Sequence, residues 1–111
     1  MSDRMILRQG DVMLVSVASL PAGATRTTKP GERVVLAWGE RTGHCHEVLA
    51  DSEAVDAFLS ELAGVRYLTA PATSTRVVHE EHGTIPIPEG IFQVVAPFEW
   101  ADSLEPRQVL D

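Results

Sequence analysis

Short apolar runs rich in β-branched side chains, separated by glycine and proline, place the strongest limit on how this chain can fold. Runs of this length and composition are typical of β-strands, and the intervening glycines and prolines favour turns. Several short strands joined by turns predict an all-β domain, either a small barrel or a sandwich. We expect the main strands at residues 11–17, 33–38, 44–49, 65–69, 74–80 and 90–95.

One segment shows a different period. Its apolar residues repeat at i, i+3, i+4 and i+7, as on one face of an α-helix: Val55, Phe58, Leu59 and Leu62. Asp51 or Ser52 can cap the start of such a helix, and Gly64 lies where its C-cap belongs. The sequence therefore predicts mainly β structure with one short helix, at about residues 53–63.

Length and charge narrow the function. The 111 residues suit one hydrophobic core and not two, so we expect one domain over residues 1–111. Nine Lys and Arg against 16 Asp and Glu give a formal net charge of −7, which disfavours nucleic acid and anionic membrane surfaces as partners. No apolar run approaches the roughly 20 residues of a membrane span. We expect a cytoplasmic protein.

All four histidines of the chain fall in two short clusters, His44 with His46 and His79 with His82. Histidines with unrelated structural roles would not be expected to segregate in this way. Side chains two residues apart on a β-strand point to the same face, so His44 and His46 can both bind one metal ion. Cys45 lies between them and should face the other side as a small buried residue.

A turn between His79 and His82 would bring the second cluster to the same ion, whereas a straight strand would point the two rings to opposite faces. The intervening glutamates and the following glycine favour such a turn. We expect a metal centre with His44, His46 and His79 as principal ligands and His82 as a fourth ligand or as support for one. The alternative is a solvated polar network of histidines without metal.

The number of ligands decides what such a centre can do. Imidazole ligands suit a divalent zinc, iron, nickel or copper ion, and the spacing does not choose among them. Three protein ligands would leave a position open for a small-molecule ligand, whereas four would close the site. Glu81 follows His79 by two residues and is the candidate catalytic acid or base, while Glu47 should point away from His46.

Two functions therefore stay open at this point. The first is a metal-binding protein that acts on or senses a small molecule. The second is a non-catalytic interaction or structural module, with a closed metal site or a metal-free histidine cluster. A surface of histidines that responds to pH would also fit the second function, because unperturbed histidines titrate near neutrality.

The first cluster resembles a motif of the cupin superfamily, a glycine followed by a short spacer and His-x-His, here Gly39, His44 and His46. Residues 88–90, Pro-Glu-Gly, are similar to the Pro-x-Gly element of the second cupin motif, but no histidine follows them. The resemblance implies a small cupin-like β-barrel, carries over His44 and His46 as ligands, and implies a homodimer. From Gln9 onward the chain also resembles short uncharacterised bacterial proteins with Thr-Gly-His-x-His and His-Glu-Glu-His motifs.

Overall fold

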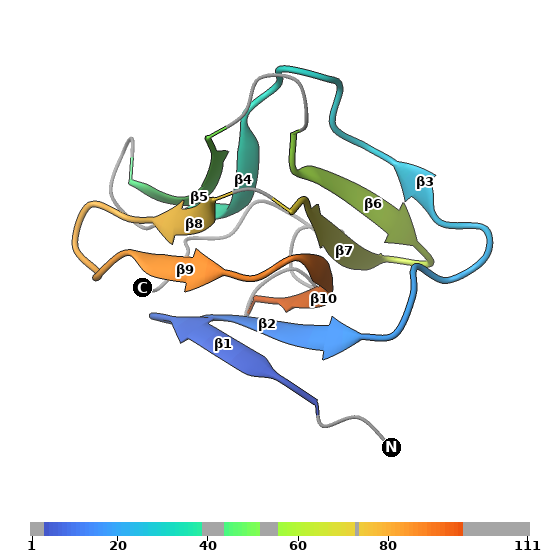
Figure 1. The fold of residues 1–111 in the computed structure, drawn as a ribbon, viewed down its shortest axis with the longest axis horizontal. Helices are drawn as coiled ribbons and strands as arrows, with labels where there is room; N and C mark the ends of the chain where they lie inside the picture. The colour runs from blue at the N-terminus through green and yellow to red at the C-terminus, as the bar shows by residue number, and fades with distance from the viewer. Residues whose placement is uncertain (1–3, 39–43, 52–55, 73, 97–111) are drawn as a thin grey trace, which may run out of the picture.

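The chain folds into two antiparallel β-sheets in the computed structural model, which describes residues 4–38, 44–51, 56–72 and 74–96 (Figure 1). The larger sheet has the strand order β1-β2-β10-β7-β6-β3, and the smaller has the order β4-β5-β8-β9. The strands of these described residues are β1 (Ile6–Gln9), β2 (Val12–Val17), β3 (Thr25–Arg26), β4 (Val34–Trp38), β5 (Cys45–Ala50), β6 (Phe58–Leu62), β7 (Val65–Ala70), β8 (Thr75–Val78), β9 (Ile85–Ile87) and β10 (Gly90–Val95).

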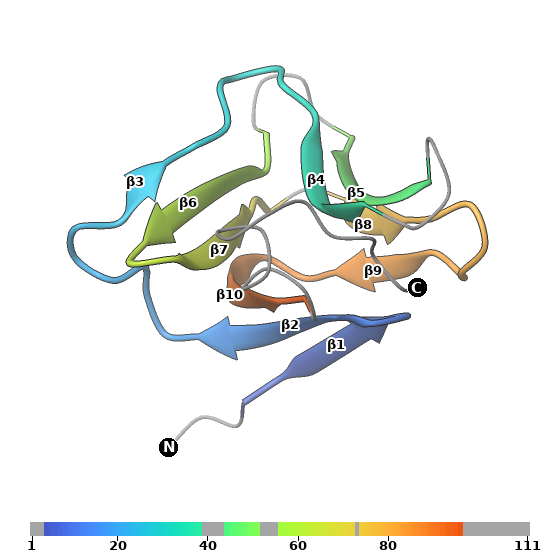
Figure 2. The same cartoon turned by 180° about the vertical axis from the view of Figure 1, so that it is seen from behind.

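The hydrophobic core lies between the two sheets. Leu14, Leu68 and Phe92 enter it from the larger sheet and Leu36 and Val77 from the smaller, each with 2% or less of its surface exposed. The sheets come close where the edge strands β1 and β9 make contact, and both views show the end of β1 near β9 (Figures 1 and 2). They remain two sheets and do not close into one barrel.

The strands expected from the sequence are confirmed to within two residues at each end. β4 and β5 pair as antiparallel neighbours, and the turn expected between them lies outside the described residues. Strands β1, β3 and β9 were not expected. β9 contains Pro86, which a central strand would exclude, but β9 lies at the edge of its sheet, where a missing N–H is tolerated.

The helix expected at residues 53–63 is wrong over residues 56–63, and residues 53–55 lie outside the described residues. Phe58–Leu62 form strand β6, which pairs antiparallel with β7, and no helix occurs anywhere in the described part of the chain. Ala63 and Gly64 join the two strands with φ of 53° and 83°. Positive φ at both central residues defines the type I′ turn of a tight hairpin, so Gly64 is a turn residue and not a helix cap. Within the described residues, no helix could span a membrane.

Strand β4 has an irregularity opposite His46 of β5. The register with β5 shifts between Val35 and Ala37, which leaves Leu36 as an extra residue and places Ala37 opposite His46. Arg66 of β7 donates hydrogen bonds from its guanidinium to the carbonyls of Val35 and Leu36. A side chain of the larger sheet thereby holds the bulged edge of the smaller one.

The Ala63-Gly64 turn gives a direct test of the β6-β7 hairpin. Ala63→Asn should raise the free energy of unfolding by about 0.5 to 1 kcal/mol, because asparagine tolerates positive φ better than alanine. Gly64→Ala should lower it by about 1 kcal/mol, because alanine is strained at φ 83°. Urea denaturation measures both changes. Destabilisation by Ala63→Asn, or no effect of Gly64→Ala, would contradict the turn.

Candidate metal centre

Strand pairing in the smaller sheet brings His46 and His79 together. Val48 of β5 lies opposite Val77 of β8, and continuing this antiparallel register by two residues places His46 opposite His79. Because side chains two residues apart share a face, both histidines point inward like the two valines. They are 3% and 8% exposed, and their ring centroids lie 4.3 Å apart.

A bend after β8 supplies the third histidine. β8 ends at Val78 and the chain bends at residues 80–82, which confirms the turn expected between His79 and His82. The Glu80 carboxylate accepts a hydrogen bond of 3.0 Å from the backbone N–H of Cys45 and so anchors the bend to β5. Hydrogen bonds from its own backbone N–H and from that of Cys45 lower the pKa of the Glu80 carboxyl.

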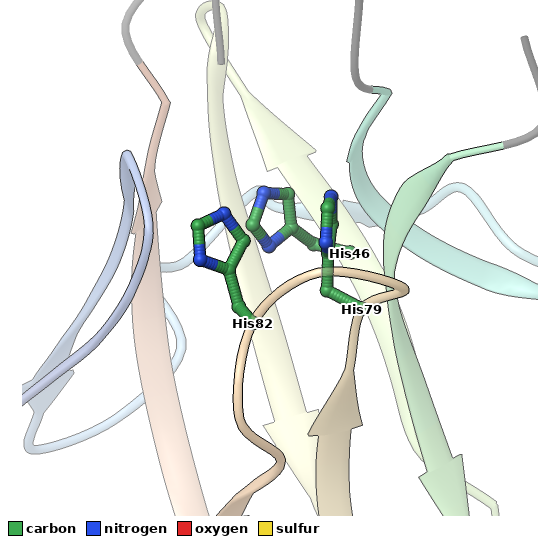
Figure 3. A group of neighbouring side chains, drawn as sticks. All are labelled: His46, His79 and His82. Carbon is green, nitrogen blue, oxygen red and sulfur yellow. The ribbon is translucent and has the colours of Figure 1, made fainter. Parts of the chain in front are cut away.

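His46, His79 and His82 form a compact group in which one ring nitrogen of each lies within 4.8 Å of the others (Figure 3). The His82 ring centroid is 4.6 Å from that of His79 and 5.7 Å from that of His46. Two nitrogens bound to one ion at about 2.1 Å in tetrahedral geometry lie about 3.4 Å apart. Movements of about 1.4 Å or less, within reach of side-chain rotation, would bring the three nitrogens to that spacing.

His79 has one ring nitrogen with a hydrogen-bond partner among the described residues and one without. Its Nδ1 accepts a hydrogen bond of 2.9 Å from the backbone N–H of Glu81, so the neutral ring carries its proton on Nε2. That Nε2 is buried and has no hydrogen-bond partner among the described residues. A buried polar atom without a partner requires an explanation, and a ligand held by the three histidines would provide one.

His46 is held by a residue that sequence reasoning did not single out. Gln9, the last residue of β1, is 4% exposed, and its Oε1 lies 2.8 Å from His46 Nδ1. The two residues are 37 positions apart in the chain. No sequence pattern marked Gln9, because its partner is set by how the two sheets meet.

His82 packs against the residue that follows Gln9. Gly10 has a φ of +58° in the two-residue turn between β1 and β2. A Cβ atom at Gly10 would lie 2.7 Å from His82 Nε2, closer than atoms can approach. The glycine therefore serves the turn and leaves room for the imidazole ring.

His44 lies at the margin of this group. His44 directly precedes β5, which begins at Cys45. Its ring centroid is 6.0 Å from that of His79, and its Nδ1 is 3.6 Å from the Glu81 carboxylate, beyond hydrogen-bond distance. The roles of His44 as a ligand and of Glu81 as an acid or base stay predictions.

Cys45 and Glu47 belong to the other face of β5. The Glu47 carboxylate pairs with the Arg33 guanidinium at 2.9 Å, and the same guanidinium lies 3.4 Å from Cys45 Sγ. Burial raises the pKa of the Cys45 thiol, and Arg33 opposes this shift. Neither residue is part of the three-histidine group, as their alternation with His46 predicts.

The fold and the site together define a small two-sheet β protein with a buried cluster of three histidines. A family model described as Domain of unknown function (DUF8820) matches residues 8–96, which is more than half of the chain. The chain belongs to this family. No curated protein and no solved structure matches the chain. The matched span includes Gln9, Gly10 and the three clustered histidines.

The contact between Gly10 and His82 can be tested with two alanine substitutions. Gly10→Ala and Gly31→Ala both place alanine at positive φ, at +58° and +82°, so each should cost about 1 to 2 kcal/mol in the free energy of unfolding. Nothing lies within 4 Å of a Cβ at Gly31. Only Gly10→Ala should therefore also shift the NMR resonances of the His82 ring. Equal effects on that ring would contradict the packing.

Proposed function

We propose that this protein binds one divalent metal ion through His46, His79 and His82 and uses that centre to act on or sense a small molecule. The proposal depends on one observation: three ring nitrogens lie within 4.8 Å of one another, contributed by strand β5, by the residue that follows β8 and by the bend after it. The buried Nε2 of His79 adds support, because a buried polar atom with no hydrogen-bond partner among the described residues is costly.

The donor set indicates the class of metal and the chemistry. Three neutral imidazoles suit zinc, iron, nickel or copper. Three protein ligands also leave a coordination position for a small oxygenated ligand or water, which such a metal polarises. This open position favours a metal centre that binds a small molecule over a metal site with a purely structural role.

Glu81 and His44 are the residues best placed to assist at this centre. Glu81 lies on the bend between His79 and His82, its side chain is 49% exposed, and its carboxylate is 3.6 Å from His44 Nδ1. A partly exposed carboxylate beside an imidazole can accept or return a proton at the rim of the site. We assign this pair to proton transfer and place neither residue among the three ligands.

Metal analysis of untagged, purified protein tests the proposal. We expect about one equivalent of zinc, iron, nickel or copper per chain, and loss of that metal in His46→Ala and in His79→Ala. The reason is that two nitrogens hold a divalent ion far less tightly than three. Elemental analysis and metal-dependent thermal shift provide the measurements.

His44→Ala is the matched control, because it removes an imidazole from the same sequence motif but not from the three-histidine group. It should retain the metal. If His44→Ala also loses the metal, His44 is a fourth ligand and the metal has no coordination position open for a small molecule. Absence of metal from the wild type, with no thermal shift on adding zinc, nickel or iron, would refute the proposal.

Metal binding should also release the backbone N–H of Glu81. A neutral His79 cannot bind metal through either nitrogen and still accept this hydrogen bond, because binding at Nδ1 uses the lone pair and binding at Nε2 places the proton on Nδ1. Adding zinc should therefore move the Glu81 amide resonance and speed its hydrogen exchange. An unchanged Glu81 amide in a zinc-saturated protein would show that His79 is not a ligand.

A further inference from the structure

The buried amide of Gln9 makes three hydrogen bonds around the histidine group. Its Nε2 donates to the carbonyl of Val77 at 3.0 Å and to the carbonyl of Gly83 at 2.8 Å. Its Oε1 lies 2.8 Å from His46 Nδ1. With 4% of its surface exposed, Gln9 exchanges these partners for water only at a high cost.

These partners fix which way the Gln9 amide faces. The two backbone carbonyls accept only, so they require the NH₂ group of the amide. The amide oxygen is then left to face His46 Nδ1, which must donate. A reversed amide would place its oxygen against two carbonyl oxygens and lose both hydrogen bonds. His46 Nδ1 therefore carries a proton, and in the neutral ring Nε2 is the unprotonated nitrogen.

The same amide reaches both of the other histidine-bearing segments. Val77 of β8 lies two residues before His79, and Gly83 directly follows His82. Its neighbour Gly10 supplies the space for the His82 ring. The corner of the β1-β2 hairpin thus contacts every segment that contributes to the group, although it contributes no ligand itself.

We propose that Gln9 is the positioning residue of the metal centre: it selects the Nδ1–H tautomer of His46 and holds the 79–83 segment against β1. This inference rests on the metal-binding function proposed above. A histidine ligand that donates its second N–H to a fixed acceptor is held in the right tautomer and orientation. Loss of such a partner typically weakens metal affinity by about 10- to 100-fold.

Gln9→Met separates this role from simple packing, because methionine fills a similar volume without polar atoms. The equivalent control is Gln93→Met, which makes the same change at a half-buried position of β10. In the metal-free protein, long-range ¹H–¹⁵N NMR reports the His46 tautomer directly. Zinc titration of the same samples reports affinity.

We expect wild type and Gln93→Met to hold His46 as the Nδ1–H tautomer and to bind zinc equally well. Gln9→Met should lose that tautomer preference and bind zinc about 10- to 100-fold more weakly. Gln9→Glu keeps an acceptor for His46 but cannot donate to Gly83, so it should retain the tautomer and still bind more weakly. If Gln9→Met does not fold, Gln9→Glu provides the test.

An unchanged His46 tautomer and unchanged zinc affinity in folded Gln9→Met would overturn the inference. The His46 Nε2–H tautomer in wild type, or its appearance in folded Gln9→Glu, would overturn it too. The tautomer is read without metal, so the two proposals fail in different ways. A wild type that binds no zinc but whose His46 tautomer depends on Gln9 refutes the metal function alone.

Discussion

The antiparallel register between β5 and β8 is the constraint on which the rest of the site depends. It places Val48 opposite Val77 in the core and, two residues on, His46 opposite His79. A slip of one residue in either strand would turn the histidine of that strand to the outer face and its outer side chains inward. The packing of the core on the same two strands therefore fixes the direction of the histidines. The same packing interactions therefore determine both the stability of the smaller sheet and the geometry of the site.

A polar group at the end of an apolar core must be satisfied from within the protein. Gln9 does this for His46 and also binds the carbonyls of Val77 and Gly83, so an edge strand of the larger sheet completes a site on the smaller one. His79 differs, because its buried Nε2 has no hydrogen-bond partner in the described part of the chain. His46 thus has its Nδ1 held by a hydrogen bond, whereas His79 has a buried Nε2 without one among the described residues, as expected of a centre that takes a ligand.

Local sequence patterns predicted six strands correctly but predicted a helix where strand β6 lies, and the two outcomes have related reasons. Alternation and β-branched composition are local properties, and they located β2, β4, β5, β7, β8 and β10. Phe58, Leu59 and Leu62 fit a helical spacing as well as they fit a strand, so the pairing of β6 with β7 made the choice. Ala63-Gly64 is a weaker turn signal than Asn-Gly, and its type is visible only from the two positive φ values.

The sequence by itself determined the β class, the segregation of four histidines into two clusters, and the bend that unites His79 with His82. Only the tertiary structure decided that His46, His79 and His82 form the compact group, that His44 lies beside it, and that Gln9 and Gly10 surround it. The physical reason is sequence separation. Gln9 meets His46 across 37 positions and the Val77 carbonyl across 68, and such contacts arise from how two sheets pack, not from any local pattern.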